Sequence, residues 1–472
     1  MSGVLAIEGF RVEAADGTAL VRSVDAEARP GRPLTLLGET GSGKSLVLAA
    51  AMGSLAPGLR AGGRVMLDGT EMLSATPSAR RALWGRRLAT LPQEPWLALD
   101  PTMRALGQVA EVYRLVRGMP AAASAEEARA RLAELGLGGV AALYPFQLSG
   151  GMAQRLALAI LRASETPVLL ADEPTKGLDA DRRDEAGARL RAEAERGRTV
   201  VCVTHDVAIA RALGGEVAVM LEGRVVERGP AARVLERPSH TYTRRLLEAE
   251  PARWPELPPR PAPCGEVAVA AEGVCRGFGG RPVLCGVDLS VRRGEIVAVT
   301  GPSGCGKTTL GDVLLGLLRP DAGTVRRLPG VVPWRFGKLY QDPPSAFAPH
   351  QTMRQALGDL ARHHGLAWDA IAALVERLRL APALLDRRPD ALSGGELQRF
   401  ALVRVLALDP VFLLADEPTS RLDPITQREV SMLLGELAGE RGLAVLLVTH
   451  DAALAAKLAD RTLRLRANGT DR

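Results

Sequence analysis

Four short motifs each occur twice along the chain, in the same order, and this repetition limits the possible folds more strongly than any other feature of the sequence. They are GETGSGKS (38–45) and GPSGCGKT (301–308), LSGGMAQR (148–155) and LSGGELQR (392–399), LLADEPT (169–175 and 413–419), and VTHD (203–206 and 448–451). The lysines of the first motif, Lys44 and Lys307, are 307 − 44 = 263 residues apart. A repeat of this length has the size of a domain, so we predict a duplicated domain rather than a solenoid of short units.

The spacing between the motifs separates a constant core from a variable periphery. The serine of LSGG precedes the glutamate of LLADEPT by 24 residues in both copies, from Ser149 to Glu173 and from Ser393 to Glu417. Between the copies lies a proline-rich segment, and such composition favours an extended tether. The sequence therefore predicts a first domain over 1–247, a linker over 248–265 and a second domain over 266–472.

Short apolar runs alternate with helical segments in each copy. The runs at 34–38 and 296–301 end in glycine, and further apolar runs precede the acidic and histidine motifs. The segments 104–147 and 353–391 are rich in Ala, Leu, Arg and Glu, a composition that favours helices. Strand–helix alternation predicts an α/β fold with a mostly parallel sheet in each domain, covered by helices, and a separate helical subdomain.

The GxxxxGK[ST] motif has the composition of a phosphate-binding loop. Its glycines allow backbone N–H groups to point at phosphate oxygens, and the start of the following helix adds positive potential. The lysine would reach the β- and γ-phosphates of ATP, and the next hydroxyl would bind Mg²⁺. One match alone could be an ordinary glycine turn, but two matches in register with three other motifs favour a nucleotide site. The candidates are Gly38, Gly41, Gly43, Lys44 and Ser45, and Gly301, Gly304, Gly306, Lys307 and Thr308.

Acidic and histidine residues follow two of the apolar runs in each copy. Asp172 and Asp416 end a predicted strand, where a carboxylate can coordinate Mg²⁺ through water. The next residues, Glu173 and Glu417, can orient or deprotonate an attacking water. His205 and His450 end a later strand, at matching distances from these glutamates, and are candidate sensors of the γ-phosphate. The alternatives are an acidic cap at a strand end and a structural histidine.

LSGG at the start of a helix supplies a second anion-binding site in each copy. Its residues are Ser149, Gly150 and Gly151 in the first copy and Ser393, Gly394 and Gly395 in the second. Two phosphate sites in one domain make sense if one of them serves the nucleotide of the neighbouring domain. With all four motifs in place, both halves resemble ATP-binding-cassette (ABC) ATPases, which are P-loop NTPases. The resemblance covers nearly the whole chain except the linker.

The resemblance implies a head-to-tail pairing of the two halves around two ATP molecules. The first site would join Lys44, Glu173 and His205 to Ser393, Gly394 and Gly395, and the second would join Lys307, Glu417 and His450 to Ser149, Gly150 and Gly151. Gln93 and Gln341 match the Q-loop of the family, which links Mg²⁺ to a transmembrane partner, and Asp179 and Asp423 match its D-loop. Both halves retain these elements, so we expect two sites competent for hydrolysis.

The family often stacks adenine on an aromatic residue about two dozen positions before the phosphate loop. Phe278 fits this position in the second half, whereas the first half has Ala14 near the equivalent place and Phe10 four residues early. We therefore predict that ATP binds more weakly at the first phosphate loop than at the second.

Composition and charge narrow the possible classes of protein. The 60 basic and 54 acidic residues leave a net charge of +6 over 472 residues, which does not favour a nucleic-acid-binding protein. The five cysteines form no CxxC pair, which makes a zinc or iron–sulfur site improbable. No run of 18 apolar residues occurs, so we expect any membrane role to come through a partner. The alternative functions are a soluble tandem ABC protein acting on ribosomes or nucleic acid, and the ATPase of an exporter.

A tail after the first domain points to one subfamily. Residues 229–251 resemble the P-x-H-x-Y-T-x-x-L-L tail of oligopeptide, dipeptide and nickel importer ATPases, and the matching residues are His240, Tyr242, Thr243, Leu246 and Leu247. A plain surface helix over the sheet is an equally good interpretation of this segment.

The resemblance implies an ATPase that energises a peptide- or nickel-type importer. Its partners would be two transmembrane permease subunits and an extracytoplasmic substrate-binding protein, with no nucleic acid. It would lie at the cytoplasmic face of a bacterial inner membrane as a peripheral protein. The sequence does not distinguish among peptides, nickel, metallophores and other small solutes as the transported cargo, because no residue of this chain would contact the cargo.

Overall fold

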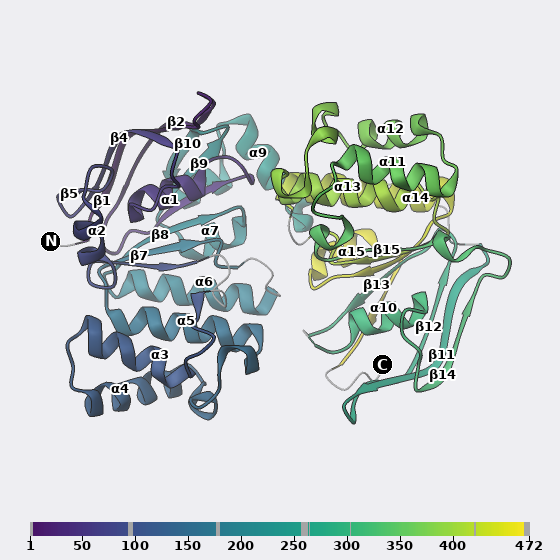
Figure 1. Cartoon of the computed structure of the whole chain (residues 1–472), viewed down its shortest axis with the longest axis horizontal. Coiled ribbons are helices and arrows are strands. Elements are labelled where there is room, and N and C mark those ends of the chain that lie inside the picture. Colours follow the sequence, from purple (N-terminus) through teal and green to yellow (C-terminus); the bar gives the residue numbers. More distant parts are fainter. Residues whose placement is uncertain are drawn as a thin grey trace. The chain divides into compact units, whose positions relative to one another are not determined.

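The computed structural model describes residues 3–92, 98–175, 180–255, 263, 265–302, 304–419 and 422–466. The chain divides into two compact units, Met1–Leu247 and Glu248–Arg472. Both contain an α/β core of the predicted type, with antiparallel strands on one side of the core and a helical subdomain on the other (Figure 1).

One ten-stranded sheet forms the core of the first unit. Its spatial order is β5-β4-β1-β2-β10-β9-β3-β8-β7-β6. The strands are β1 (Leu5–Glu13), β2 (Ala19–Ala28), β3 (Leu34–Gly38), β4 (Arg60–Leu67), β5 (Thr70–Glu71), β6 (Leu88–Leu91), β7 (Val168–Asp172), β8 (Thr199–Thr204), β9 (Glu216–Leu221) and β10 (Arg224–Pro230). The run from β9 to β6 is parallel, and β1, β2, β4 and β5 pair antiparallel. β3 and β8 are buried along their whole length, as expected for strands covered on both faces.

The helices of the first unit cover this sheet and build the subdomain. They are α1 (Lys44–Met52), α2 (Pro77–Leu83), α3 (Ala105–Glu111), α4 (Ala121–Glu134), α5 (Gly150–Ser164), α6 (Ala180–Glu195), α7 (Val207–Leu213), α8 (Ala231–Glu236) and α9 (Thr241–Glu248), with a π-helical turn over Val112–Val116. Figure 1 shows α3, α4 and α5 gathered into one group. The helical prediction for 104–147 is therefore confirmed.

Two sheets form the second unit. The five-stranded sheet is entirely parallel, in the order β15-β16-β17-β13-β18, and the three-stranded sheet is antiparallel, in the order β12-β11-β14. The strands are β11 (Val267–Phe278), β12 (Arg281–Arg292), β13 (Ile296–Thr300), β14 (Ala322–Arg327), β15 (Phe336–Leu339), β16 (Phe412–Asp416), β17 (Ala444–Val448) and β18 (Arg461–Arg464). The mostly parallel core predicted from the sequence is present in both units.

The helices of the second unit repeat the pattern of the first. They are α10 (Lys307–Leu315), α11 (Met353–His364), α12 (Trp368–Arg377), α13 (Gly394–Leu406), α14 (Pro424–Arg441) and α15 (Ala452–Leu458). α11, α12 and α13 form the subdomain and share one buried apolar cluster with β16 and β17. The helical prediction for 353–391 is confirmed as well, with two short 3₁₀ turns after α12.

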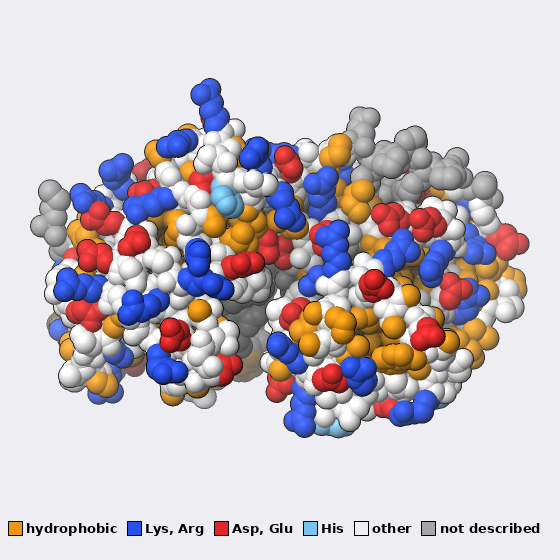
Figure 2. Space-filling view, turned by 90° about the horizontal axis from the view of Figure 1, so that it is seen from above, with side chains coloured by type: hydrophobic (Ala, Val, Ile, Leu, Met, Phe, Trp, Pro, Cys, Tyr) orange, Lys and Arg blue, Asp and Glu red, His pale blue; other side chains and the backbone are white. Residues whose placement is uncertain are grey.

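None of the helices within the described part of the chain is long and apolar enough to cross a membrane. On the face that Figure 2 shows, basic and acidic side chains are interspersed over the surface. This mixed pattern agrees with the small net charge and differs from the concentrated basic face typical of nucleic-acid-binding proteins.

Candidate functional site

Three neighbouring parallel strands bring the predicted residues of the first unit together. β3, β8 and β7 lie side by side, with Leu37 opposite Thr204 and Asp172 opposite Val203. Because the carboxyl ends of parallel strands share one edge of a sheet, the loop after β3 meets the residues that follow β7 and β8. This edge is where open α/β sheets bind their ligands.

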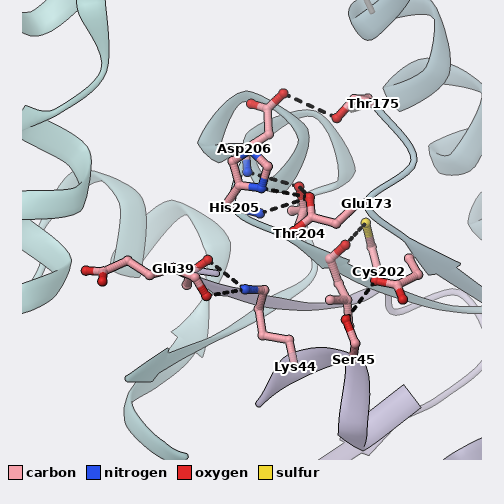
Figure 3. A network of polar contacts seen from close by, with 12 residues as sticks. Glu39, Lys44, Ser45, Glu173, Thr175, Cys202, Thr204, His205 and Asp206 are labelled. Carbon is pink, nitrogen blue, oxygen red and sulfur yellow. Dashed lines mark hydrogen bonds and ion pairs between the residues drawn. The ribbon is translucent and has the colours of Figure 1, made fainter. Parts of the chain in front are cut away.

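The loop after β3 holds the Lys44 ammonium at its centre (Figure 3). Lys44 Nζ donates to the carbonyl oxygen of Gly38 at 2.8 Å and to that of Glu39 at 2.6 Å. Gly43, just before α1, has a φ of 95°, a conformation that favours glycine. The loop therefore curls around the ammonium and feeds directly into the helix that begins at Lys44, the arrangement that cradles phosphates.

Oxygen ligands suited to Mg²⁺ lie beside this loop in each unit. Ser45 Oγ is 3.3 Å from Asp172 Oδ1. In the second unit burial raises the pKa of the Asp416 carboxyl, although a hydrogen bond from Thr308 opposes that rise. A hydroxyl paired with a carboxylate is the kind of donor set that Mg²⁺ takes alongside nucleotide phosphates, so both pairs fit this ion.

Glu173 and His205 form a close pair behind the loop. His205 Nδ1 is 2.9 Å from Glu173 Oε2, and Thr204 Oγ1 donates to the same oxygen at 3.2 Å. Burial raises the pKa of the Glu173 carboxyl, but the charge of His205 and its hydrogen bond outweigh burial, and the pKa lies below its ordinary value. For His205 burial lowers the pKa, but the Glu173 charge outweighs it and the pKa lies above its ordinary value. Glu173 is thus an ionised acceptor at neutral pH.

Both glutamates have an unusual backbone. Glu173 has a φ of 46° and Glu417 a φ of 49°, in the left-handed region that non-glycine residues rarely occupy. Each N–H nevertheless donates to the neighbouring strand, from Glu173 to Val203 O at 2.8 Å and from Glu417 to Val448 O at 2.9 Å. Strain of this kind persists where the surroundings over-determine it, and it is concentrated at functional sites.

The second unit repeats this geometry. β13, β17 and β16 are neighbours, so the loop after β13 meets Glu417 and His450 at one sheet edge. Lys307 Nζ donates to Gly301 O at 2.8 Å and to Pro302 O at 3.0 Å. His450 Nδ1 is 2.8 Å from Glu417 Oε2. The two units therefore contain matching constellations of lysine, hydroxyl, aspartate, glutamate and histidine.

The sequence pattern of the ABC transporter family matches residues 21–176 and 284–420, together more than half of the chain. The chain belongs to the ABC transporter family. Its two units are ABC ATPase domains, which bind ATP and couple its hydrolysis to transport.

Several curated relatives are similar to this chain over most of its length. A protein from Agrobacterium fabrum named peptidoglycan transport ATP-binding protein YejF is 32% identical, covering 94% of this chain and 87% of its own. An uncharacterised ABC transporter ATP-binding protein YejF from Escherichia coli is 32% identical, with 98% and 94% covered. The glutathione import ATP-binding protein GsiA from Shigella dysenteriae is 30% identical, with 97% and 84% covered.

Solved structures are similar to the chain in fold. The archaeal ribosome recycling factor aABCE1, solved in complex with a ribosomal stalk protein, has a TM-score of 0.67 at 20% identity, covering 98% of this chain and 89% of its own. A structure described as RNase-L inhibitor has a TM-score of 0.65 at the same identity. At this level of identity the likeness concerns the fold alone.

The ABC signature serines, Ser149 and Ser393, lie at the N-terminal ends of α5 and α13, one helix in each subdomain. Ser149 accepts from Met152 N and Ser393 from Glu396 N, both at 3.3 Å. Glu396 also accepts from the Ser393 hydroxyl at 2.8 Å, a contact that Met152 cannot make in the first unit. Ser149 and Ser393, with the first glycine after each, are exposed at the helix start, where backbone N–H groups lack intrahelical partners.

The Q-loop and D-loop predictions fall partly outside the described residues. Gln93 and Asp179 both lie outside them. Gln341 follows β15 and is exposed. Asp423 is buried and caps α14 by accepting from Ile425 N and Thr426 N. The roles of the two glutamines in Mg²⁺ binding stay predictions.

Phe278 occupies the end of β11 in the second domain. It is 48% exposed, and the Arg276 guanidinium lies 5.0 Å from the centre of its ring. In the first domain β1 ends at Glu13 and leads into a turn at Ala14, while Phe10 is completely buried in the core. The first domain thus offers no aromatic side chain at this turn, which is the basis for expecting weaker ATP binding there.

Replacing Phe278 with Ala tests the adenine assignment. We expect ATP affinity at the second phosphate loop to fall by about 1–3 kcal/mol, taking the value for a base stacked on an aromatic side chain. The measurement is nucleotide binding in a Lys44→Ala background. In this background only the second phosphate loop keeps its lysine, so the measured affinity reports on the second loop. Trp334→Ala, an exposed aromatic residue of the same unit, is the matched control. Unchanged affinity in Phe278→Ala would show that the ring does not contact adenine.

Sequence reasoning missed two contacts of the first site. Thr204 donates to the Glu173 carboxylate. A threonine precedes the histidine in both VTHD motifs, and this repetition was the available signal. Tyr242, in the tail helix α9, accepts a hydrogen bond from Glu39 N in the phosphate loop at 3.0 Å. The tail motif drew attention to Tyr242, but a separation of 203 residues hid its partner.

Proposed function

We propose that the chain is the ATP-hydrolysing subunit of a bacterial importer for peptide-type solutes. The observation that supports this most directly is the similarity to peptidoglycan-transport and glutathione-import ATP-binding proteins over 94% and 97% of the chain. These matches extend beyond the two family regions at 21–176 and 284–420. Because the names of these relatives specify peptidoglycan and glutathione, we favour peptide-type cargo over nickel.

Each domain would use the same division of labour. The loop lysines, Lys44 and Lys307, bind the nucleotide phosphates. Ser45 and Thr308, each beside an aspartate, would hold Mg²⁺, which would supply charge neutralisation at the phosphates. Glu173 and Glu417 accept a proton from the attacking water. His205 holds the Glu173 carboxylate in place and keeps it ionised.

The partners of this subunit would be two transmembrane permeases and a substrate-binding protein outside the cytoplasm. The chain would act as a peripheral protein at the cytoplasmic face of the inner membrane. The exposed position of Gln341 after β15 is compatible with contact to a permease.

Co-purification with transmembrane permeases of the source organism tests this function. We expect the chain to form a membrane-extractable complex with them, and its ATPase activity to rise when a loaded substrate-binding protein is added to the reconstituted complex. Glutathione and short peptides are the first solutes to assay. Association with ribosomes instead, with no permease bound, would contradict the proposal.

A further inference from the structure

The tail helix α9 reaches the first phosphate loop through one hydroxyl group. Tyr242 is 4% exposed, and its Oη accepts a hydrogen bond from the Glu39 backbone N–H at 3.0 Å. Thr243, Leu246 and Leu247 make up the rest of the buried face of this short helix. The phenol ring of Tyr242 is therefore packed into the first domain, and its hydroxyl contacts the first phosphate loop.

The bond acts on the same peptide group that holds the loop lysine. The N–H of Glu39 and the C=O of Gly38 belong to one planar trans peptide and point in opposite directions. Tyr242 Oη binds the N–H end, and Lys44 Nζ binds the C=O end at 2.8 Å. Fixing one end of a rigid plane fixes the other, so the tyrosine sets the direction of a carbonyl that positions the ammonium.

The tyrosine is itself anchored at the start of its helix. Glu227 on β10 accepts from Ser239 N at 2.7 Å and from His240 N at 3.0 Å. Burial opposes ionisation of Glu227, but these and further hydrogen bonds outweigh it and lower its pKa to about 2. A buried acceptor that is ionised at neutral pH thus ties the segment before α9 to the central sheet, and Tyr242 starts from a fixed position.

The second domain orients the equivalent peptide by other means. Gly301 O holds Lys307 Nζ at 2.8 Å, as Gly38 O holds Lys44. The next residue is Pro302, which has no N–H to donate and whose ring restricts φ. A tyrosine bond of the kind seen in the first domain is chemically impossible there.

We propose that Tyr242 is a positioning residue for ATP binding at the first phosphate loop, and that the tail helix is in this way a part of the first ATP site only. The inference rests on the proposed binding of ATP at Lys44. In this role Tyr242 acts on the nucleotide site indirectly, through the Gly38–Glu39 peptide.

The test measures binding of a fluorescent ATP analogue to the full chain in a Lys307→Ala background. In this background only the first phosphate loop keeps its lysine, so the measured affinity reports on the first loop. Tyr242→Phe keeps the ring and removes the acceptor. We expect the dissociation constant to rise about two- to tenfold, the range for loss of one neutral hydrogen bond. The same substitution in a Lys44→Ala background, which reports the second loop, should leave affinity unchanged.

Glu39→Pro supplies the second arm, because it copies the residue of the second loop and removes the donor. In a Glu39→Pro background, Tyr242→Phe should have no further effect on affinity. If Tyr242→Phe lowers nucleotide affinity equally with Glu39 and with Pro at this position, Tyr242 acts through packing and the inference is overturned. The inference is also overturned if Tyr242→Phe causes no loss of affinity when Glu39 is present.

Tyr113→Phe is the matched control for stability. Tyr113 is equally buried and accepts from Arg131 Nε at 3.3 Å, within the helical subdomain. It should change the melting temperature without changing nucleotide affinity. Failure of the Lys307→Ala parent to bind any nucleotide would contradict ATP binding at Lys44, whereas unchanged binding in Tyr242→Phe contradicts only the role of the tyrosine.

Discussion

Replacing both Glu173 and Glu417 with Gln is expected to lower ATP turnover by about 10²–10⁴-fold, the usual contribution of a positioned general base. Glutamine keeps the size of the side chain but cannot take a proton from water. Binding of ATP should persist, because the loop lysines are unchanged, so the variant should retain ATP that it does not hydrolyse. Turnover and retained nucleotide are measured on the same preparation.

Glu165→Gln is the control for this experiment. Glu165 also has a left-handed backbone, with a φ of 49°, but it is exposed and lies between α5 and β7, at the opposite end of β7 from Asp172. Its substitution should leave turnover unchanged. Hydrolysis at the parent rate in the double glutamine variant would exclude Glu173 and Glu417 as the bases.

Exchanging the loop lysines for arginine, in Lys44→Arg and Lys307→Arg together, is expected to weaken ATP binding by at least about tenfold, because hydrogen bonds to charged groups contribute about 1.5–3 kcal/mol. The positive charge is retained, but the planar guanidinium is larger than an ammonium and matches poorly the place where Lys44 Nζ bonds to Gly38 O and Glu39 O. Equilibrium binding of labelled ATP measures the loss.

Lys457→Arg is the matched control for the lysine exchange. Only five of the 60 basic residues are lysines, and Lys457 on α15 has no assigned role. Its replacement should leave binding unchanged. If the loop arginine variants bind ATP as tightly as the parent, the loops recognise positive charge without regard to its shape.

The sequence predicted the core of each site because the relevant information is local. Glycine, lysine and hydroxyl residues adjoin one another in each loop, and Asp172 and Glu173 directly follow an apolar run. Parallel pairing then brings these short segments to one sheet edge, as the pairing of Asp172 with Val203 shows. The strand–helix alternation defined the fold class for the same reason.

Contacts between distant segments could not be predicted in this way. The bond from Glu39 to Tyr242 depends on how the tail packs on the domain, and no periodicity encodes that packing. The burial of Phe10 was equally hidden, because an aromatic residue in a strand can face the core or the solvent. The sequence also gave no sign that Glu173 and Glu417 have left-handed backbones, since glutamate rarely adopts them.

The left-handed backbones of Glu173 and Glu417 lower the stability of the fold at the residues that we propose to activate water. A glycine would occupy the same backbone at lower conformational cost, because a side chain in this region costs roughly 1–2 kcal/mol. Directed evolution for heat resistance alone would therefore be free to replace the very residues proposed to activate water. Any effort to engineer a hardier version of this protein needs a screen for turnover at every round.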